Sequence, residues 1–304
     1  MDNRAEVREF LTSRRARITP QEVGLPTGSN RRVDGLRRAE VATLAGVSVE
    51  YYTKLERGAI SGASPEILDA ISKALRMDDA ERAHLFALAH AASPVARPPR
   101  RRNPKCWTPH ASLQWMLDAV TGGPAFVRNG RLDILATNVL ARAFYKDVYD
   151  MPGQPPNIAR FTFLDERAYD FYPDWDMFAE VTVAILRTEA GRDPHNKELH
   201  DLIGELSTRS NDFRRLWSSH NVRHHGTGFK TFRHSVVGEM TLAYEGMEME
   251  SEPGLSITVY ATEPGSDSAD RMKLLASWAA SEYGTVSTAA EPAATKAESE
   301  KPER

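Results

Sequence analysis

The segment Leu36 to Gly58, LRRAEVATLAGVSVEYYTKLERG, constrains the fold more than any other part of this 304-residue chain. Val41, Ala42 and Ala45 have the spacing of the inner face of a short helix. Gly46 follows at the point where the chain must leave that helix through a left-handed conformation, which glycine adopts without a steric penalty. The pattern therefore predicts one short helix that ends in a tight glycine turn.

The residues after this turn predict a second short helix at an angle to the first. Val47 can fill the corner between the two helices, and the hydroxyl of Ser48 can cap the second one. Tyr52 and Leu55 then fall on its inner face, and Gly58 ends it. The segment is thus predicted to form a helix-turn-helix.

Two helices joined by a glycine turn, the second ending in basic residues, match the geometry of DNA-binding helix-turn-helix units. The alternative is an ordinary helical hairpin in a metabolic protein. A small residue, Gly, then Val-Ser at this spacing is more specific than a lone glycine turn and favours DNA binding. The predicted DNA-binding residues are Arg38, Ser48, Val49, Glu50, Tyr51, Thr53, Lys54 and Arg57.

Charge is distributed unevenly along the chain. Residues 1–106 carry 19 Lys and Arg against 13 Asp and Glu, whereas residues 107–304 carry 20 against 29. A basic first part on an acidic remainder suggests that a polyanion meets only the first part.

The single cysteine, Cys106, excludes an intramolecular disulfide framework, and neither a signal peptide nor an apolar run of membrane-spanning length is visible. We therefore expect a cytoplasmic protein that does not enter a membrane.

Helical signals extend over the first 92 residues. Glu6 to Arg15 has apolar residues at helical spacing, and Thr19-Pro20 is expected to start another turn. Residues 25–35 are predicted to be a loop from their Pro, Gly, Ser and Asn content. Ser64-Pro65 and the capping-box spacing from Asp78 to Glu81 predict two more helix starts. This part is therefore expected to be all-α, a bundle of about five helices.

The second part of the chain mixes strand and helix periods. Asn129-Gly130 separates two short apolar segments and predicts a hairpin with a primed turn. Several helices, three strands and a final helix follow, so we expect an α+β domain with an antiparallel sheet. The expected strands are 125–128, 132–135, 229–234, 239–244 and 255–262, and the expected helices are 138–147, 174–190, 197–207, 212–219 and 269–279.

Composition divides the chain into four parts. Residues 1–92 are the predicted DNA-binding domain, and residues 93–106, rich in Pro and Arg, are a predicted basic linker. Residues 107–280 are the predicted second domain. Residues 281–304 contain few large apolar side chains and are predicted to be a disordered tail.

These sequences resemble a known family. LAGVSVEYYTKLERG followed by SPEILDAISKAL is similar to the XRE, or Cro/C1-type, repressor domain. The long loop at 25–35 distinguishes this chain from the simplest members of that family. This loop and the segment DDAERAHLFALA resemble the MmyB-like regulators of actinobacteria. The C-terminal half is similar to that family too, in DWDMFAEVTVAILRTEAGR, FRHSVVGEMTLAYEGM and LSITVYATEPGS. The resemblance covers about residues 4 to 279.

The resemblance implies a helix-turn-helix followed by a PAS-like sensor domain with a small-molecule cavity, for which fatty-acid-like ligands are expected. Matching to repressor positions makes Val49, Glu50 and Lys54 the base readers. Val49 suits contact with a thymine methyl, Glu50 can accept a hydrogen bond from cytosine N4, and Lys54 can donate to guanine O6 or N7. Arg38 and Arg57 are then expected to hold phosphates. A surface carboxylate that only stabilises the helix is the alternative for Glu50.

One such unit covers a half-site, so a homodimer on an inverted repeat of double-stranded DNA is expected. Arg31 and Arg32 in the loop either flank the DNA backbone or are simply solvated.

The second domain contains enough apolar residues to line a cavity. For most of them a place in the core is the favoured interpretation, but a subset is expected to contact a ligand, whose carboxylate would need a cation. Arg214, Arg215 and Arg142 are candidates for that cation. The predicted ligand-binding residues are Phe126, Phe144, Phe178, Phe213, Trp217 and Arg214.

Two alternatives for the second domain stay open. It could serve dimerisation alone, or it could sense a metal through His220, His224 and His225, with His234 nearby. Zinc needs three or four converging ligands, and the chain has no Cys pair or H-E-x-x-H motif, so we predict no metal site. No G-x-S-x-G, P-loop or G-x-G-x-x-G motif occurs either. We therefore expect no enzymatic activity and no cofactor.

Overall fold

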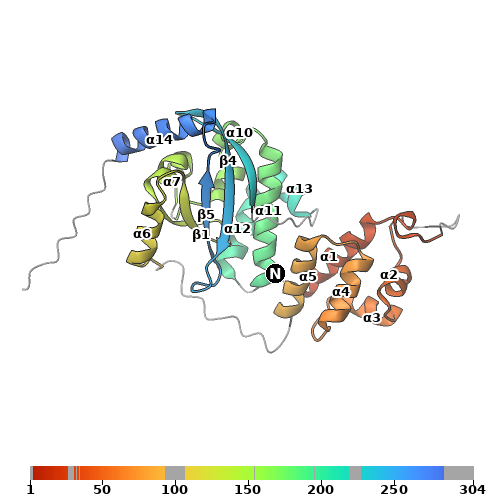
Figure 1. The fold of residues 1–304 in the computed structure, drawn as a ribbon. Helices are drawn as coiled ribbons and strands as arrows, with labels where there is room; N and C mark the ends of the chain where they lie inside the picture. Colours follow the sequence, from red (N-terminus) through yellow and green to blue (C-terminus); the bar gives the residue numbers. More distant parts are fainter. Residues whose placement is uncertain are drawn as a thin grey trace, which may run out of the picture.

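The computed structural model contains a helical N-terminal domain and a mixed C-terminal domain (Figure 1). The predicted linker, residues 93–106, and the part of the predicted tail from residue 284 onward lie outside the described residues. No helix in the described part of the chain combines the length and the apolar character needed to cross a membrane. The structure describes residues 3–26, 31, 33, 35–92, 107–153, 155–194, 196–218 and 227–283.

The N-terminal domain is all-α, as predicted. Its core is formed by apolar side chains from every helix, among them the fully buried Phe10, Leu36 and Tyr52. Burial of such side chains is the main term that stabilises a small helical domain. Its elements are α1 (Asn3–Arg17), the 3-10 turn η1 (Gln21–Val23), α2 (Arg38–Ala45), α3 (Val49–Glu56), α4 (Pro65–Ala74) and α5 (Asp79–Ala91).

The predicted helix starts agree with the observed caps. Pro65 occupies the first turn of α4, and the side chain of Asp78 accepts a hydrogen bond of 2.8 Å from the backbone of Glu81 at the start of α5. The backbone and hydroxyl of Thr19 both donate to the carboxylate of Glu22, which closes the short turn η1. Local hydrogen bonds therefore define these boundaries.

The C-terminal domain is built on one antiparallel sheet with the strand order β2-β1-β5-β4-β3. The prediction of an α+β fold is confirmed. Helices α7 to α11 and α14 pack on one face of this sheet, which we call the inner face, and α6 packs on the other (Figure 1). Helices α12 and α13 lie beyond α9 and α11 and form a separate core with them. The strands are β1 (Ala125–Asn129), β2 (Ile134–Thr137), β3 (Thr227–His234), β4 (Gly238–Glu248) and β5 (Leu255–Ala261).

Three helices of this domain, α6, α9 and α10, were not predicted. In α9 the sequence IARFTFL has β-branched and aromatic residues at several positions, which weakens a helical pattern. The side chain of Asn157 nevertheless caps it by accepting from the backbone of Arg160 at 2.8 Å. The helices are α6 (Ala111–Ala119), α7 (Val139–Phe144), α8 (Lys146–Tyr149), α9 (Ile158–Leu164), α10 (Arg167–Phe171), α11 (Trp175–Arg192), α12 (Lys197–Arg209), α13 (Asn211–Ser218) and α14 (Asp267–Tyr283).

The predicted hairpin between β1 and β2 exists, but its predicted two-residue primed turn is wrong. The positive φ lies at Leu132 (+66°) rather than at Gly130, and the ladder is interrupted between Val127 and Arg128. The side chain of Asn129 organises the longer loop by accepting from the backbones of Arg131 and Asp133. An Asn that bonds to the backbone two residues on competes with a tight turn, which explains the difference.

The two domains contact each other through helices. The N-terminal domain places α1 and α5 against the C-terminal half of α11 (Figure 1). The Glu6–Arg187 pair in this contact joins residues that are 181 positions apart in the sequence.

Candidate functional site

The helix-turn-helix forms as predicted. Gly46 adopts φ +67° with open space around its α-carbon, so its backbone conformation alone requires glycine. Ser48 caps α3 by accepting a hydrogen bond of 3.0 Å from the backbone N–H of Tyr51. Tyr52 and Leu55 are buried against the rest of the domain. The opposite face of α3 is therefore free to meet a partner.

This outward face carries all three predicted base readers. Val49 is 40% exposed, and Glu50 and Lys54 are exposed beside it. Together with Thr53 and Arg57 they line one shallow hollow of about 400 Å³. The face thus combines a branched apolar side chain, a carboxylate and two cations, which is the mixture that reads base edges and phosphates.

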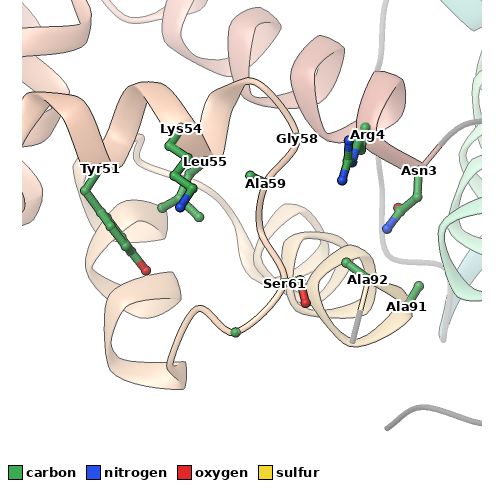
Figure 2. Close-up of a pocket in the computed structure, with 11 residues that line it drawn as sticks. Asn3, Arg4, Tyr51, Lys54, Leu55, Gly58, Ala59, Ser61, Ala91 and Ala92 are labelled. Atoms are coloured by element: carbon green, nitrogen blue, oxygen red, sulfur yellow. The ribbon is translucent and has the colours of Figure 1, made fainter. Parts of the chain in front are cut away.

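A second hollow of about 450 Å³ lies next to the first, between α3 and the ends of α1 and α5 (Figure 2). Tyr51 and Lys54 border it from α3, and Arg4 borders it from α1 (Figure 2). Lys54 belongs to both hollows, whereas Tyr51 does not line the first one. Arg4 extends the basic surface beyond the residues that the sequence pattern selected.

Arg38 has a structural partner that the sequence did not reveal. Its guanidinium donates to the carboxylate of Glu56, which is fully buried in the N-terminal domain. Arg15 donates to the same carboxylate at 2.8 and 3.0 Å, and the hydroxyl of Thr12 does so at 3.0 Å. The side chain of Arg38 stays 46% exposed and lies at the start of α2.

The buried carboxylate of Glu56 is ionised. Burial by itself raises its pKa, but the hydrogen bonds from Arg38 and Arg15 outweigh burial and leave the pKa below its ordinary value. The other charged residues of α3, Glu50 and Lys54, are exposed. The only sequence signal for the burial of Glu56 is its helical spacing to the buried Tyr52, which places both residues on the same face of α3.

The loop arginines differ. Arg31 makes a two-pronged ion pair with Glu40, at 2.7 and 2.9 Å, and so fastens the loop to α2. Arg32 lies outside the described residues.

The C-terminal domain has a small pocket between the inner face of the sheet and α11. Its void is about 60 Å³. Because side chains alternate along a strand, every second residue of the central strands points toward it. Its lining residues are Phe126, Arg128, Leu132, Tyr145, Ile158, Tyr172, Phe178, Val181, Thr182, Ile185, Lys230, Tyr244, Gly246, Thr258 and Tyr260.

Helix α11 forms one wall of this pocket. Phe178, Val181, Thr182 and Ile185 follow the three- and four-residue spacing of a single helix face. This face of α11 therefore closes the pocket opposite the sheet.

Two cations lie among the aromatic and apolar side chains of the pocket. The ammonium of Lys230 lies 4.0 Å from the ring centre of Tyr244 and 5.5 Å from that of Phe178. Arg128 donates to the backbone carbonyl of its neighbour Asn129 at 3.5 Å. Among the described residues, neither cation forms an ion pair with a carboxylate.

Burial changes the acid–base properties of this pair. It lowers the pKa of Arg128, and burial together with the nearby Arg128 lowers the pKa of Lys230 to about 8. The hydroxyls of Tyr145 and Tyr260 are 3.1 Å apart beside them. A sequence signal for the two pocket cations exists. Arg128 lies two residues from Phe126 and Lys230 two residues from Phe232, so each cation shares the inward side of its strand with an apolar ring.

The structure brings only some of the predicted ligand-binding residues together. Phe126 and Phe178 line the pocket, whereas Phe144 lies outside its lining, in the aromatic core, with its ring 5.0 Å from that of Phe232. Phe213 and Trp217 stack on each other in a separate core between α11 and α12.

None of the three arginines suggested as partners of a ligand carboxylate lies at the pocket. Arg214 is exposed and donates to Asn211, and Arg215 pairs with Asp212. Arg142 lies over the ring of Tyr149, 3.6 Å from its centre. The cations at the pocket come from strands, not from these helices.

Of the four histidines considered as metal ligands, the structure describes only His234. His220, His224 and His225 lie outside the described residues. His234 is buried, and its ring nitrogens contact the carbonyl of Ala143 and the backbone N–H of Val236, each at 3.2 Å. No group of three or more metal-binding side chains occurs among the residues that the structure describes.

Comparison with family models agrees with both halves of this geometry. Residues 6–85 match a helix-turn-helix domain, and residues 109–275 match the MmyB-like transcription regulator ligand binding domain. A search of curated proteins found no match. Both models describe domains of transcription regulators rather than enzymes. With its DNA-binding helix pair and a matched ligand-binding domain over more than half its length, the chain belongs to the MmyB-like transcription regulators.

Proposed function

We propose that this regulator responds to a small hydrophobic acid, of the fatty-acid type, that binds in the C-terminal pocket and changes its binding to operator DNA in the cytoplasm. The observation that supports this is the pair Arg128 and Lys230, two cations without a carboxylate partner among the described residues, inside an aromatic and apolar lining. A buried charge is costly unless an opposite charge meets it. A ligand carboxylate would supply that charge, and its hydrocarbon part would contact Phe126 and Phe178.

The size of the void bears on which acid binds. A water molecule needs roughly 10–15 Å³ of such space. The void of about 60 Å³ therefore holds about four to six such volumes, which suits a short carboxylate. A longer chain requires side chains on α11, such as Val181 and Ile185, to move.

The test is direct binding of straight-chain acids to the full-length protein. Isothermal titration with butanoate, octanoate and tetradecanoate is expected to show binding, while the matching 1-alcohols bind much more weakly because they lack the charge. Equal binding of acids and alcohols would reject the role of the two cations. Absence of binding by all acids, with a clean solvent extract in mass spectrometry, would favour a C-terminal domain used for dimerisation alone.

For DNA, we propose that two copies bind an inverted repeat, with Val49, Glu50 and Lys54 at base edges and Arg38 and Arg57 at phosphates. The hollow that Val49, Glu50, Lys54 and Arg57 share on the outward face of α3 supports their part of this assignment. Arg38 does not line this hollow and is included because its side chain is 46% exposed at the start of α2. Sequences selected from a random duplex library are expected to contain two related half-sites about one helical turn apart. Light scattering of the protein with and without such a duplex measures the number of copies; one copy per duplex would contradict the dimer.

A further inference from the structure

Helix α11 has two faces with different partners. Val181, Thr182 and Ile185 face the ligand pocket. Arg187, two residues further, lies about 200° around the helix axis from Ile185 and therefore faces away from the pocket. Its side chain is fully buried, because the N-terminal domain covers that face.

Arg187 makes an ion pair across the domain boundary. Its guanidinium donates to the carboxylate of Glu6 on α1 at 2.6 Å, a contact between residues 181 positions apart. The same guanidinium donates to the backbone carbonyl of Trp217 and lies 4.3 Å from the centre of its ring. Glu6 is 4% exposed, so both charges of the pair are removed from water.

Close packing surrounds this pair. His84 on α5 lies 3.9 Å from the Glu6 carboxylate, with its ring edge-on to Phe10. Gly191, one turn beyond Arg187, faces the His84 ring so closely that an added Cβ would lie 2.8 Å from a ring carbon. The C-terminal half of α11 is thus fitted to the N-terminal domain without spare space.

Such a contact is suited to being shifted. The Coulomb attraction of a buried ion pair is largely offset by the cost of removing both charges from water, so the intact pair by itself adds little to docking. Loss of one partner is costly, however, because it leaves the other charge buried and unpaired. Contacts between domains of one chain commonly resemble transient interfaces. A ligand that prefers one arrangement can therefore change the population of docked domains by its difference in affinity.

We infer that α11 connects the ligand pocket to the DNA-binding domain, and that the Glu6–Arg187 ion pair transmits pocket occupancy by controlling how the two domains dock. The pocket-to-signal part of this inference rests on the proposed function. The acid that enters the pocket displaces the Val181–Ile185 segment, and the rigid helix carries that displacement to Arg187.

The consequence for DNA is geometric. Helix α3 lies on the side of the N-terminal domain away from α11, so docking leaves the reading face uncovered (Figure 1). Docking instead fixes the orientation of α3 relative to the C-terminal domain. In a two-copy complex this orientation determines whether both α3 helices reach half-sites one turn apart.

Hydrogen exchange of the full-length protein without ligand tests the connection itself. Glu6→Gln removes one charge, and Gly191→Ala forces His84 and α11 apart from the other side. Both variants are expected to speed amide exchange over residues 181–186 by on the order of threefold to thirtyfold, the range of typical coupling energies. Arg192→Gln is the matched control, because Arg192 lies on the same helix but pairs with Glu248 at the surface.

The inference is overturned if exchange over residues 181–186 in both variants equals that in Arg192→Gln. Adding octanoate separates this inference from the proposed function. Octanoate binding to the wild type should change exchange in α1 and α5, and Glu6→Gln should abolish that change. If octanoate does not bind but the variants loosen residues 181–186, the connection stands and the proposed ligand class fails. If octanoate binds and α1 and α5 do not respond, the connection fails alone.

Discussion

Two sites of interior charge, Glu56 in the N-terminal domain and the pocket cations in the C-terminal domain, are paired in opposite ways. In the N-terminal domain the buried carboxylate of Glu56 receives hydrogen bonds from Arg15, Arg38 and Thr12. In the C-terminal domain the cations Arg128 and Lys230 lie beside aromatic rings, and no described carboxylate pairs with either of them.

The difference separates a structural charge from a binding charge. A satisfied network such as that of Glu56 holds α1, α2 and α3 in one arrangement and leaves nothing for a ligand to gain. Two half-buried cations without a described carboxylate partner carry an energetic cost in the empty protein that an anionic ligand can relieve. Removing a charge should therefore have opposite effects on stability at the two sites.

Replacing Glu56 is expected to have the largest effect. Glu56→Gln leaves Arg15 and Arg38 without their carboxylate and should lower the free energy of unfolding by about 3 kcal/mol, the lower end for a broken buried pair because Arg38 is half exposed. Chemical denaturation followed by circular dichroism measures it. Glu50→Gln on the exposed face of α3 is the control and should change stability little.

The depressed pKa of Glu56 adds a pH dependence with a definite sign. The folded pKa lies below the unfolded one, so its contribution is complete above about pH 4.5 and is lost as the pH falls through the folded pKa. Equal acid sensitivity of the wild type and Glu56→Gln would contradict this assignment.

Replacing Arg128 is expected to weaken acid binding while leaving the empty protein at least as stable. Arg128→Met should lower the affinity for octanoate by about 2–4 kcal/mol in titration calorimetry. The same change should raise the free energy of unfolding of the unliganded protein by about 1 kcal/mol, because a half-buried cation without a directly paired carboxylate is removed. A variant that is destabilised as strongly as Glu56→Gln would show that Arg128 is structural.

An exposed cation provides the third case. Lys54→Ala should leave stability unchanged and weaken binding to the selected operator by about 1–3 kcal/mol, if Lys54 reads a base edge. Fluorescence anisotropy with operator and with random duplex measures this. Equal loss on both duplexes would make Lys54 a phosphate contact instead, as expected for Arg57→Ala.

The smallest effect is the pH dependence of acid binding. Octanoate prefers the protonated form of Lys230, whose pKa of about 8 in the empty pocket means that affinity is constant below that pH and falls above it, by at most about tenfold per pH unit. Titrations between pH 6.5 and 9.5 test it, with Lys230→Met as the control. A profile of the variant that still bends near pH 8 would assign the dependence to another group.

Local sequence determined the DNA-binding half. Gly46, Ser48 and the spacing of Tyr52 and Leu55 act within a few residues of one another, so their pattern predicts the turn, the cap and the outward face that the structure contains. The α+β class of the second domain was predicted for the same reason, because strand and helix periods are local properties. The hairpin turn was wrong where the side chain of Asn129 replaced a simple turn.

Tertiary structure decided which charges meet. Arg128 and Lys230 come from strands β1 and β3, which are separated in the sheet by β5 and β4, and Arg187 meets Glu6 across the domain boundary. The sequence indicated Arg214 on a helix because a local pattern reports the face of an element, not which distant element covers it. Pairings over long sequence separations follow from packing of the whole chain, and they placed both the pocket cations and the contact between the domains.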